Sequence, residues 1–345
     1  MPVLINRNIC RDIMKKKIAL IYGGNSSEVE ISVQSGKNVA SCIDKTRYDV
    51  YEVLLIGSSW KVQLYGKDST QAPVAEVEVD KTDFSFTYEG VKTKFDLAYI
   101  MIHGTPGENG LLQGYFEMLG IPFSTCSSFV SAITFDKHSC KRFLDFAGVK
   151  MAKDVFLRKG QSYNSNAIVK ELGLPLFVKP TDGGSSFGVS KVKREEDLDI
   201  AIEAAFKESD TILIEECITG REMTNGIYTK NGEIVNLPVT EIVTDREFFD
   251  YEAKYLGMSN EICPAPISEE LTHNIQELTT HIYKYLGCEG LVRVDYIVKG
   301  YDIYFLEINT IPGMTAMSLV PAQVRTAGID MGDFFTTLIE EAEKR

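Results

Sequence analysis

The chain has 345 residues, of which 44% are hydrophobic, so it is long enough for two or three domains with buried cores. Its formal net charge of -13 argues against binding to nucleic acid or to an anionic membrane, because these surfaces attract dense basic faces. Seven cysteines and four histidines are scattered, without a C-x-x-C pair, which fits a reducing cytoplasm and gives a structural zinc ion no ligand cluster. We therefore expect a cytoplasmic protein that acts on small molecules.

Residues 1–16 show little periodic pattern. We expect a disordered leader there, or an upstream start with Met14 as the natural first residue. From 17 to 125 the pattern is that of an open, doubly wound α/β domain with a parallel sheet. Its apolar runs at 17–22, 51–56 and 96–102 predict buried strands, because each run ends in glycine or a polar turn, and residues 32–43 predict a helix.

A different architecture is expected from residue 126 onward. Residues 131–146 predict one continuous helix that ends before Gly148. Short strands near 155–157, 176–179, 189–192 and 212–215, around a single helix at 195–209, predict a small α+β domain over 126–214. The last domain, 215–345, mixes hairpins with a helix at 268–286, and its polar aromatic stretch at 244–260 suits a lid loop.

The first group of residues suited to chemistry lies on a hairpin formed by 291–298 and 301–309. Because alternate residues of a strand share a face, we expect one face to pack inward through Val292, Val294, Tyr296, Val298, Tyr304, Leu306 and Ile308. The other face then carries Arg293, Asp295, Glu307 and Asn309. Two carboxylates and an amide suit magnesium with nucleotide phosphates, whereas an ion pair on a solvated sheet face is the alternative. The Pro-Gly turn at 310–315 favours the first interpretation, because its backbone amides can approach an anion.

A second group is the segment 178–189, which begins with Lys179 and is rich in glycine and serine. Such a hairpin tip can wrap phosphates, because glycine leaves the backbone amides accessible, although the segment matches neither common phosphate-loop motif. A plain flexible turn is an equally good interpretation.

The third group consists of two predicted strand ends, 23–32 and 103–110. Open α/β sheets bind ligands at the carboxyl ends of their strands, where Glu30 suits an ammonium group and a helix N-terminus attracts a carboxylate. An amino acid carries both groups. The alternatives are that Glu30 interacts only with its own helix dipole and that His103 is an ordinary loop histidine.

Taken in this order, the three groups resemble the D-alanine–D-alanine ligases of the ATP-grasp superfamily, cytoplasmic enzymes that make the terminal dipeptide of bacterial peptidoglycan. The resemblance spans 17–342, and its most specific motifs are 23–24 with 30–32, 103–108, 250–255, 307–310 with 312–315, and 318–321. It implies an ATP-grasp fold preceded by the open parallel-sheet domain. The nucleotide would lie between the middle and C-terminal domains.

The resemblance also implies roles for individual residues. ATP would be bound by Lys137, Lys179, Ser186, Glu215, Cys217, Ile218, Glu222 and Lys254. Two magnesium or manganese ions would be bound by Asp295, Glu307 and Asn309. The first D-alanine would be held by Glu30, Arg293 and the Gly313 amide, with Ser185 and Tyr255 hydrogen-bonded to Glu30. The second would be held by Ser318 and Leu319, and His103 would also contact substrate. Cys217 departs from the family pattern, which often has a bulky aromatic residue at the adenine hinge.

By the same resemblance, one D-alanine carboxylate attacks ATP to give an acyl phosphate, and the amine of a second D-alanine displaces phosphate to give D-alanyl-D-alanine. A homodimer is implied as well. Within the family, the alternative is a ligase that makes D-alanyl-D-lactate or D-alanyl-D-serine, and Tyr255 in its local context favours the dipeptide. The alternative outside enzymes is an ATP-grasp module that binds nucleotide without turnover.

Overall fold

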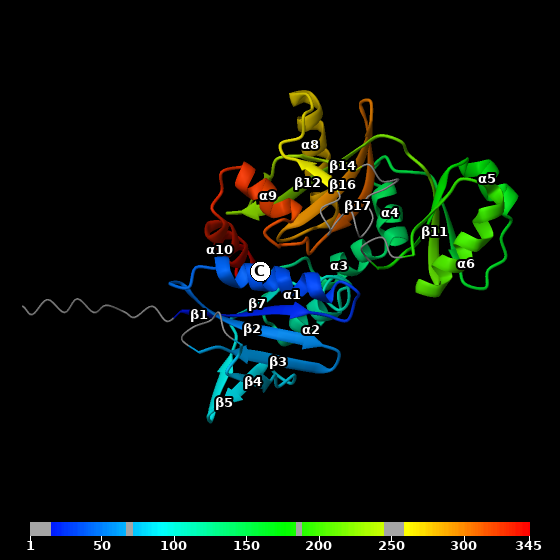
Figure 1. Cartoon of the computed structure of the whole chain (residues 1–345). Coiled ribbons are helices and arrows are strands. Elements are labelled where there is room, and N and C mark those ends of the chain that lie inside the picture. The colour runs from blue at the N-terminus through cyan, green and yellow to red at the C-terminus, as the bar shows by residue number, and fades with distance from the viewer. Residues whose placement is uncertain (1–14, 67–71, 184–187, 245–258) are drawn as a thin grey trace, which may run out of the picture.

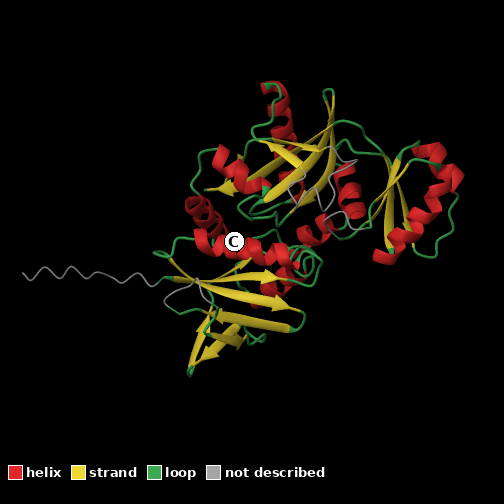
Figure 2. Ribbon diagram, in the orientation of Figure 1, coloured by secondary structure: helices red, strands yellow, loops and turns green. Residues whose placement is uncertain are grey.

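The computed structural model describes residues 15–66, 72–183, 188–244 and 259–345 (Figure 1). Three main sheets follow one another along the chain, and helices cover them (Figure 2). Of the predicted leader at 1–16, residues 1–14 lie outside the described part, and Lys16 already begins the first strand.

The N-terminal sheet has the strand order β4-β3-β2-β1-β7. Its strands are β1 (Lys16–Gly23), β2 (Tyr48–Ile56), β3 (Ser59–Leu64), β4 (Ala75–Glu78) and β7 (Leu97–Ile100). β1 pairs in parallel with β2 and β7, which confirms the predicted parallel core, whereas β3 and β4 extend the sheet antiparallel. The strands β5 (Ser85–Tyr88) and β6 (Val91–Lys94) form a separate hairpin, and the helices of this region are α1 (Val29–Cys42) and α2 (Leu111–Leu119).

Two helices, α3 (Ser128–Phe135) and α4 (Lys137–Asp145), stand where one continuous helix was predicted. The break is at Asp136, whose backbone is extended, with φ -86° and ψ 108°. Its carboxylate accepts a hydrogen bond from the Ser139 amide at 2.7 Å and so caps the second helix. The prediction of one helix was wrong because the apolar spacing continues across Asp136. An aspartate can either continue a helix or cap the next one, and the spacing does not distinguish the two.

The central sheet is antiparallel, with the order β10-β9-β11-β8. Its strands are β8 (Asp154–Arg158), β9 (Leu176–Pro180), β10 (Ser190–Val192) and β11 (Thr211–Glu216). The expected helix at 195–209 is a short 3-10 turn, Glu195–Asp197, followed by α6 (Leu198–Glu208). A second helix, α5 (Ser165–Leu172), was not expected, and it lies beside α6 (Figure 1). The expected border between 214 and 215 falls inside β11.

The C-terminal sheet has the order β15-β14-β12-β16-β17, with β13 paired to β12. Its strands are β12 (Arg221–Lys230), β13 (Glu233–Asn236), β14 (Thr240–Thr244), β15 (Ser259–Ile262), β16 (Val292–Lys299) and β17 (Asp302–Asn309). The helices are α8 (Glu269–Leu286), α9 (Leu319–Thr326) and α10 (Met331–Ala342). α8 confirms the predicted helix, since Ser268 caps its first turn and Gly287 ends it with φ 70°. Most of the predicted lid, 245–258, lies outside the described residues.

The hairpin of β16 and β17 contains a β-bulge that changes which residues face the core. Asp295 pairs with Glu307, but the next pair is Tyr296 with Phe305, so one residue of β17 has no partner. Phe305 is therefore buried, whereas Tyr304 and Leu306 are only partly buried. The predicted inward face is wrong at those two positions, because strict alternation does not survive an inserted residue.

The N-terminal sheet and the C-terminal helices share one hydrophobic core. Leu20 of β1 belongs to the same buried cluster as Phe334 and Phe335 of α10. α10 lies beside α1 and also packs directly on this sheet, where the Phe335 ring contacts the Tyr99 ring of β7 (Figure 1). The Asn38 side chain of α1 also donates a hydrogen bond to the Met314 carbonyl at 2.7 Å. The loop after β17 is thus fixed against the first domain.

Candidate active site

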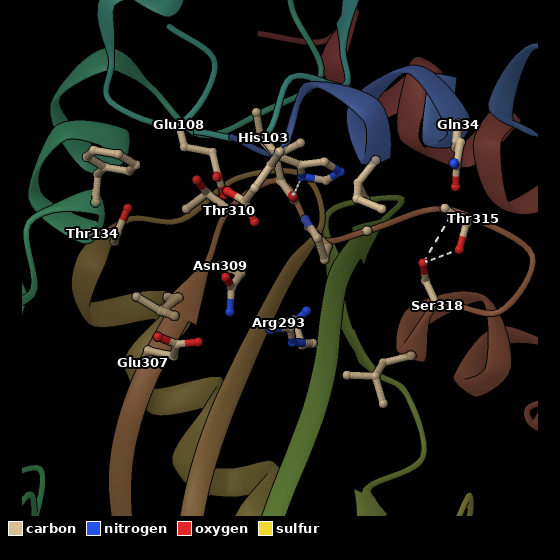
Figure 3. A pocket seen from close by; sticks show the side chains of 18 of the residues that line it. Gln34, His103, Glu108, Thr134, Arg293, Glu307, Asn309, Thr310, Thr315 and Ser318 are labelled. Atoms are coloured by element: carbon tan, nitrogen blue, oxygen red, sulfur yellow. Dashed lines mark hydrogen bonds between the residues drawn. The ribbon is translucent and has the colours of Figure 1, made fainter. Parts of the chain in front are cut away.

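A cavity of about 450 Å³ lies where α1, the loop after β7, the ends of β16 and β17, and the loop before α9 meet. Figure 3 shows Arg293, Glu307 and Asn309 on the strands, with His103 and Glu108 on the opposite side of the cavity. The sequence groups at 23–32, 103–110 and 291–309 therefore converge at one place. The glycine-rich segment 178–189 contributes Gly183 to the cavity wall.

The centre of the strand face is the carboxylate of Asp295, which is almost fully buried. Arg293 donates to both of its oxygens, from Nε to Oδ1 at 2.9 Å and from Nη2 to Oδ2 at 2.7 Å. The Thr224 hydroxyl donates to Oδ1 at 2.5 Å, and the Asn309 amide donates to Oδ2 at 3.2 Å. Such charge-assisted bonds fix the carboxylate in one orientation.

Glu307 and Asn309 offer oxygen ligands for a magnesium ion, and Asp295 can join them by exchanging one of its four hydrogen bonds for the ion. Asp295 pairs directly with Glu307 across the two strands, and Arg293 pairs with Asn309. Asn309 uses its amide nitrogen on Asp295, so its amide oxygen is left for a ligand. Among the described residues, no cluster of three or more acidic, histidine or cysteine side chains could hold a metal alone. This donor set fits magnesium, which takes one or two carboxylates and completes its shell with water and phosphate oxygens.

The structure places Glu28 in the cavity wall in place of Glu30. Glu28 immediately precedes α1 and is buried, whereas Glu30 is exposed and does not line the cavity. Glu28 is the residue before the first turn of α1 and Glu30 lies within that turn, and positions two residues apart at a helix start are separated by roughly 200° around the axis. The two side chains therefore point to different sides. The prediction of Glu30 as a cavity residue is therefore wrong. Sequence spacing did not distinguish the two carboxylates, because both lie near the same strand end.

His103 and Glu108 come from the loop after β7 and are tied to the backbone around the cavity. The His103 Nδ1–H donates to the Ile311 carbonyl at 2.9 Å, and burial lowers the pKa of this imidazole. Glu108 accepts a bond from the Gly104 amide at 2.7 Å. Burial, with the neighbouring Glu28 carboxylate, raises the pKa of Glu108 to about 8. Glu108 lies in the motif 103–108, but the sequence did not predict it as a residue of the cavity.

The loop before α9 brings Gly313, Ser318 and Leu319 to the other end of the cavity. The Ser318 hydroxyl accepts a bond from the Thr315 amide at 3.0 Å and lies 2.8 Å from the Thr315 hydroxyl (Figure 3). A side chain at Gly313 would approach this hydroxyl to 3.0 Å, so glycine keeps the turn tight. Ser318 and Leu319 stand at the N-terminus of α9, where a carboxylate is favoured by the helix dipole.

The residues predicted to bind ATP lie at the edge of the cavity and beside it. Lys137 lines the cavity and donates from Nζ to the Gly183 carbonyl at 2.9 Å. Lys179 of β9 forms an ion pair with Glu215 of β11 at 2.5 Å. Cys217 and Ile218 follow β11, and Glu222 lies in β12, all partly buried and outside the cavity wall. Four predicted residues lie outside the described residues: Ser185, Ser186, Lys254 and Tyr255.

One further carboxylate in the cavity wall was not predicted. Glu261 belongs to β15 and lines the cavity. Burial raises the pKa of its carboxyl above the ordinary value, and the positive charge of Arg293 opposes this only in part. It directly follows the predicted lid loop 244–260, and no local pattern marks it as a site residue. Only the pairing of β15 with β14 brings it to the site.

Comparison with known proteins identifies the family. The profile described as the N-terminus of D-ala D-ala ligase matches residues 17–126, and that of the C-terminus matches residues 143–340. The D-alanine–D-alanine ligase of Phocaeicola vulgatus is 49% identical over 328 residues, which cover 95% of this chain and 99% of that protein.

Solved structures agree with this relationship. The VanG D-Ala:D-Ser ligase from Enterococcus faecalis is 34% identical, with a TM-score of 0.82, and the match covers 95% of this chain and 99% of that chain. The D-alanine–D-alanine ligase from Bacillus anthracis complexed with ATP is 29% identical, with a TM-score of 0.76 and coverage of 95% and 98%. With matches along nearly its whole length and a cavity built from the motifs of the resemblance, the chain belongs to the D-alanine–D-alanine ligase family.

Proposed function

We propose that this protein joins two D-alanine molecules to D-alanyl-D-alanine at the expense of ATP, and so supplies peptidoglycan precursor synthesis. The observation that carries the proposal is the cavity, which combines buried carboxylates, a guanidinium group and a helix N-terminus in a chain of this family. Buried carboxylates can bind the ammonium group of an amino acid, and a helix N-terminus can bind its carboxylate. The guanidinium group can bind a phosphoryl group.

ATP is proposed to bind beside the central and C-terminal sheets. Lys137 and Lys179 contact its phosphates, Glu215 with the Cys217 and Ile218 backbone contacts adenine, and Glu222 contacts ribose. Ser186 and Lys254 remain proposed nucleotide ligands. The Bacillus anthracis relative solved with ATP supports the choice of nucleotide.

Two magnesium or manganese ions are proposed at Asp295, Glu307 and Asn309. Bound there, the ions supply neutralisation of the charge on the transferring phosphoryl group. The support is the oxygen donor set on two paired strands. Arg293 lies beside these residues and orients the carboxyl oxygens of the substrate together with the Gly313 amide.

The amino acids are proposed to bind across the rest of the cavity. Glu28 replaces Glu30 as the acceptor for the ammonium group of the first D-alanine, and Ser185 and Tyr255 remain its proposed partners. Ser318 and Leu319 bind the carboxylate of the second D-alanine through a hydroxyl group and the N-terminus of α9. His103 fixes the shape of the pocket through its bond to Ile311.

The reaction has two steps. A carboxylate oxygen of the first D-alanine attacks the γ-phosphorus of ATP, and ADP leaves, which gives D-alanyl phosphate. The amine of the second D-alanine then attacks the carbonyl carbon and loses a proton, and phosphate leaves. Alignment of the reactants in such a cavity contributes roughly 7–11 kcal/mol. The buried walls also exclude water, which would hydrolyse the acyl phosphate.

We propose that the second substrate is D-alanine in preference to D-serine or D-lactate. The supporting observation is the 49% identity with a D-alanine–D-alanine ligase, against 34% with a D-Ala:D-Ser ligase. The test is an incubation with ATP, magnesium, D-alanine and equal amounts of D-serine and D-lactate, followed by mass analysis. D-alanyl-D-alanine should predominate, and a predominant mixed product would overturn the assignment.

A cytoplasmic location is proposed because the six cysteines of the described residues are free thiols, and ATP is an intracellular substrate. Within the described ranges, no helix is long and apolar enough to cross a membrane.

A homodimer is also proposed, through the exposed side of α2, α3 and the end of α4, which we call the α2–α4 surface. Leu111 and Met118 of α2, Phe129 of α3 and Phe146, which directly follows α4, are its large exposed apolar side chains. Apolar side chains that gather at a surface mark protein interfaces.

A further inference from the structure

A buried network of charges lies on the face of the central sheet that carries Lys179. Its centre is Lys141 of α4, whose side chain is only 4% exposed. The Lys141 ammonium group donates to Glu215 Oε1 at 2.6 Å and to the Ala152 carbonyl at 2.8 Å, and it lies 3.0 Å from Asp154 Oδ1. The Lys141 ammonium group therefore makes two hydrogen bonds and one further ion pair in a site from which water is largely excluded.

The network continues from Lys141 to a residue that we assign to ATP. The second oxygen of Glu215, Oε2, lies 2.5 Å from the Lys179 ammonium group. Glu215 pairs across the strands with Asp154 on β8, and Lys179 lies on the neighbouring strand β9. One carboxylate thus joins a lysine of α4 to a lysine of the sheet.

The buried charges of this network balance, and the half-exposed Arg142 contacts Asp154 from the surface. Lys141 and Lys179 supply two buried positive charges, and Glu215 and Asp154 supply two buried negative charges. Burial raises the pKa of the Glu215 carboxyl, but the ammonium groups of Lys179 and Lys141 outweigh it and keep the pKa below its ordinary value. A buried carboxylate held by two ammonium groups keeps a fixed position, because the loss of either would leave a buried charge uncompensated.

We infer that Lys141 is a positioning residue for ATP binding. By occupying Oε1 of Glu215, it restricts Lys179 to the single oxygen Oε2 and so sets where the Lys179 ammonium group points. Without Lys141, both oxygens of Glu215 are available to Lys179, which is then drawn away from the triphosphate. The inference rests on the proposed function, because it takes Lys179 as a phosphate ligand, but it concerns a residue that touches neither substrate.

The test compares variants in steady-state kinetics, with ATP and D-alanine varied separately. Lys141→Met should raise the KM for ATP at least about tenfold, with the KM for D-alanine changed less than about twofold. Lys141→Arg, which keeps the charge and donors, should recover most of this loss. Arg142→Met is the matched control: Arg142 also contacts Asp154, at 2.7 Å, but it is 48% exposed, and its loss should leave the KM for ATP unchanged.

A second variant guards against loss of folding. Lys141→Met with Asp154→Asn removes one buried charge of each sign, so the remaining Lys179–Glu215 pair stays balanced, and the KM for ATP should still rise. A folded single or double variant with a wild-type KM for ATP overturns the inference. If neither variant folds, the network serves folding and not the placement of Lys179, which also overturns it. Absence of D-alanine-dependent ADP release in the wild type would instead reject the proposed function.

Discussion

Two carboxylates two residues apart provide a matched test of the amino-acid site. Glu28 lies in the cavity wall and Glu30 is exposed. We expect Glu28→Gln to lower kcat/KM for D-alanine by about 10- to 100-fold, because hydrogen bonds to charged groups contribute roughly 1.5–3 kcal/mol. Glu30→Gln should leave kcat/KM nearly unchanged. Steady-state kinetics at varied D-alanine measures both, and a larger loss in Glu30→Gln would contradict the placement.

Glu108 gives the protein a pH dependence of stability with a definite sign. Its folded-state pKa is about 8 because the carboxyl is buried, whereas the pKa in the unfolded chain is about 4. The folded state therefore binds a proton that the unfolded state has lost between these values. This contribution to stability is complete below about pH 4 and is lost as the pH rises to about 8.

The variant Glu108→Gln should remove this part of the pH dependence. Its melting temperature should fall less than that of the wild type between about pH 5 and about pH 8, because an amide does not titrate. Thermal unfolding at several pH values measures the difference. Parallel curves for the two proteins would assign the pH dependence to other groups.

Among single residues, the sequence predicts the proposed metal-binding face better than the proposed amino-acid site. Asp295 and Glu307 follow from strand alternation on one hairpin, and the structure pairs them. Glu28 could not be separated from Glu30, because the difference lies in burial at a helix start. Lys141 carries no sequence signal at all, since its partners lie on distant strands.

At the scale of elements, the break between α3 and α4 sets the position of Lys137. Asp136 caps α4, and the Lys137 amide donates to the Thr181 carbonyl at 2.7 Å. Asp136→Ala should cost about 1 kcal/mol of stability through the lost cap. It should also raise the KM for ATP, because the first turn of α4 presents Lys137 to the cavity.

The natural control is Ser127→Ala at the start of α3. Its cap bond to the Val130 amide is longer, at 3.4 Å, and no proposed ATP ligand follows it. Denaturant unfolding and ATP kinetics of both variants test the argument. An equal rise in the KM for ATP in Ser127→Ala would show that the cap of α4 has no special role.

Elements that depend on a single inserted or capping residue escaped prediction. The bulge in β17 turns Phe305 inward, and no pattern in the sequence distinguishes Leu306 from a regular strand residue. The short helix α5 was missed because it has only two turns. Longer elements such as α8, with a cap at each end and a full amphipathic pattern, were predicted nearly to the residue.

At the scale of the whole molecule, the α2–α4 surface predicts the oligomeric state. We expect light scattering to give twice the 38.5 kDa chain mass. A charge at the centre of an apolar interface is costly, so Phe129→Asp should give a monomer. Ile200→Asp is the control, since Ile200 is similarly exposed but lies on α6, and it should stay dimeric. A dimeric Phe129→Asp would place the interface elsewhere.

The sequence predicts which parts of the chain form the three sheets, but it does not predict how the sheets pack against one another. The core shared by β1 and α10 joins opposite ends of the chain, and local periodicity carries no information about such contacts. The same is true of the cavity, whose walls come from segments as distant as Glu28 and Ser318. The family resemblance, more than the pattern of any one segment, predicted that these walls meet.

The proposed reaction depends on activation of a D-alanine carboxylate by phosphorylation in the cavity. The most direct measurement uses D-alanine with both carboxylate oxygens replaced by ¹⁸O, together with ATP and magnesium. We expect ADP, D-alanyl-D-alanine and phosphate that carries one ¹⁸O atom, and no product from Glu307→Gln, even at saturating magnesium. Phosphate without label, or release of AMP in place of ADP, would contradict it.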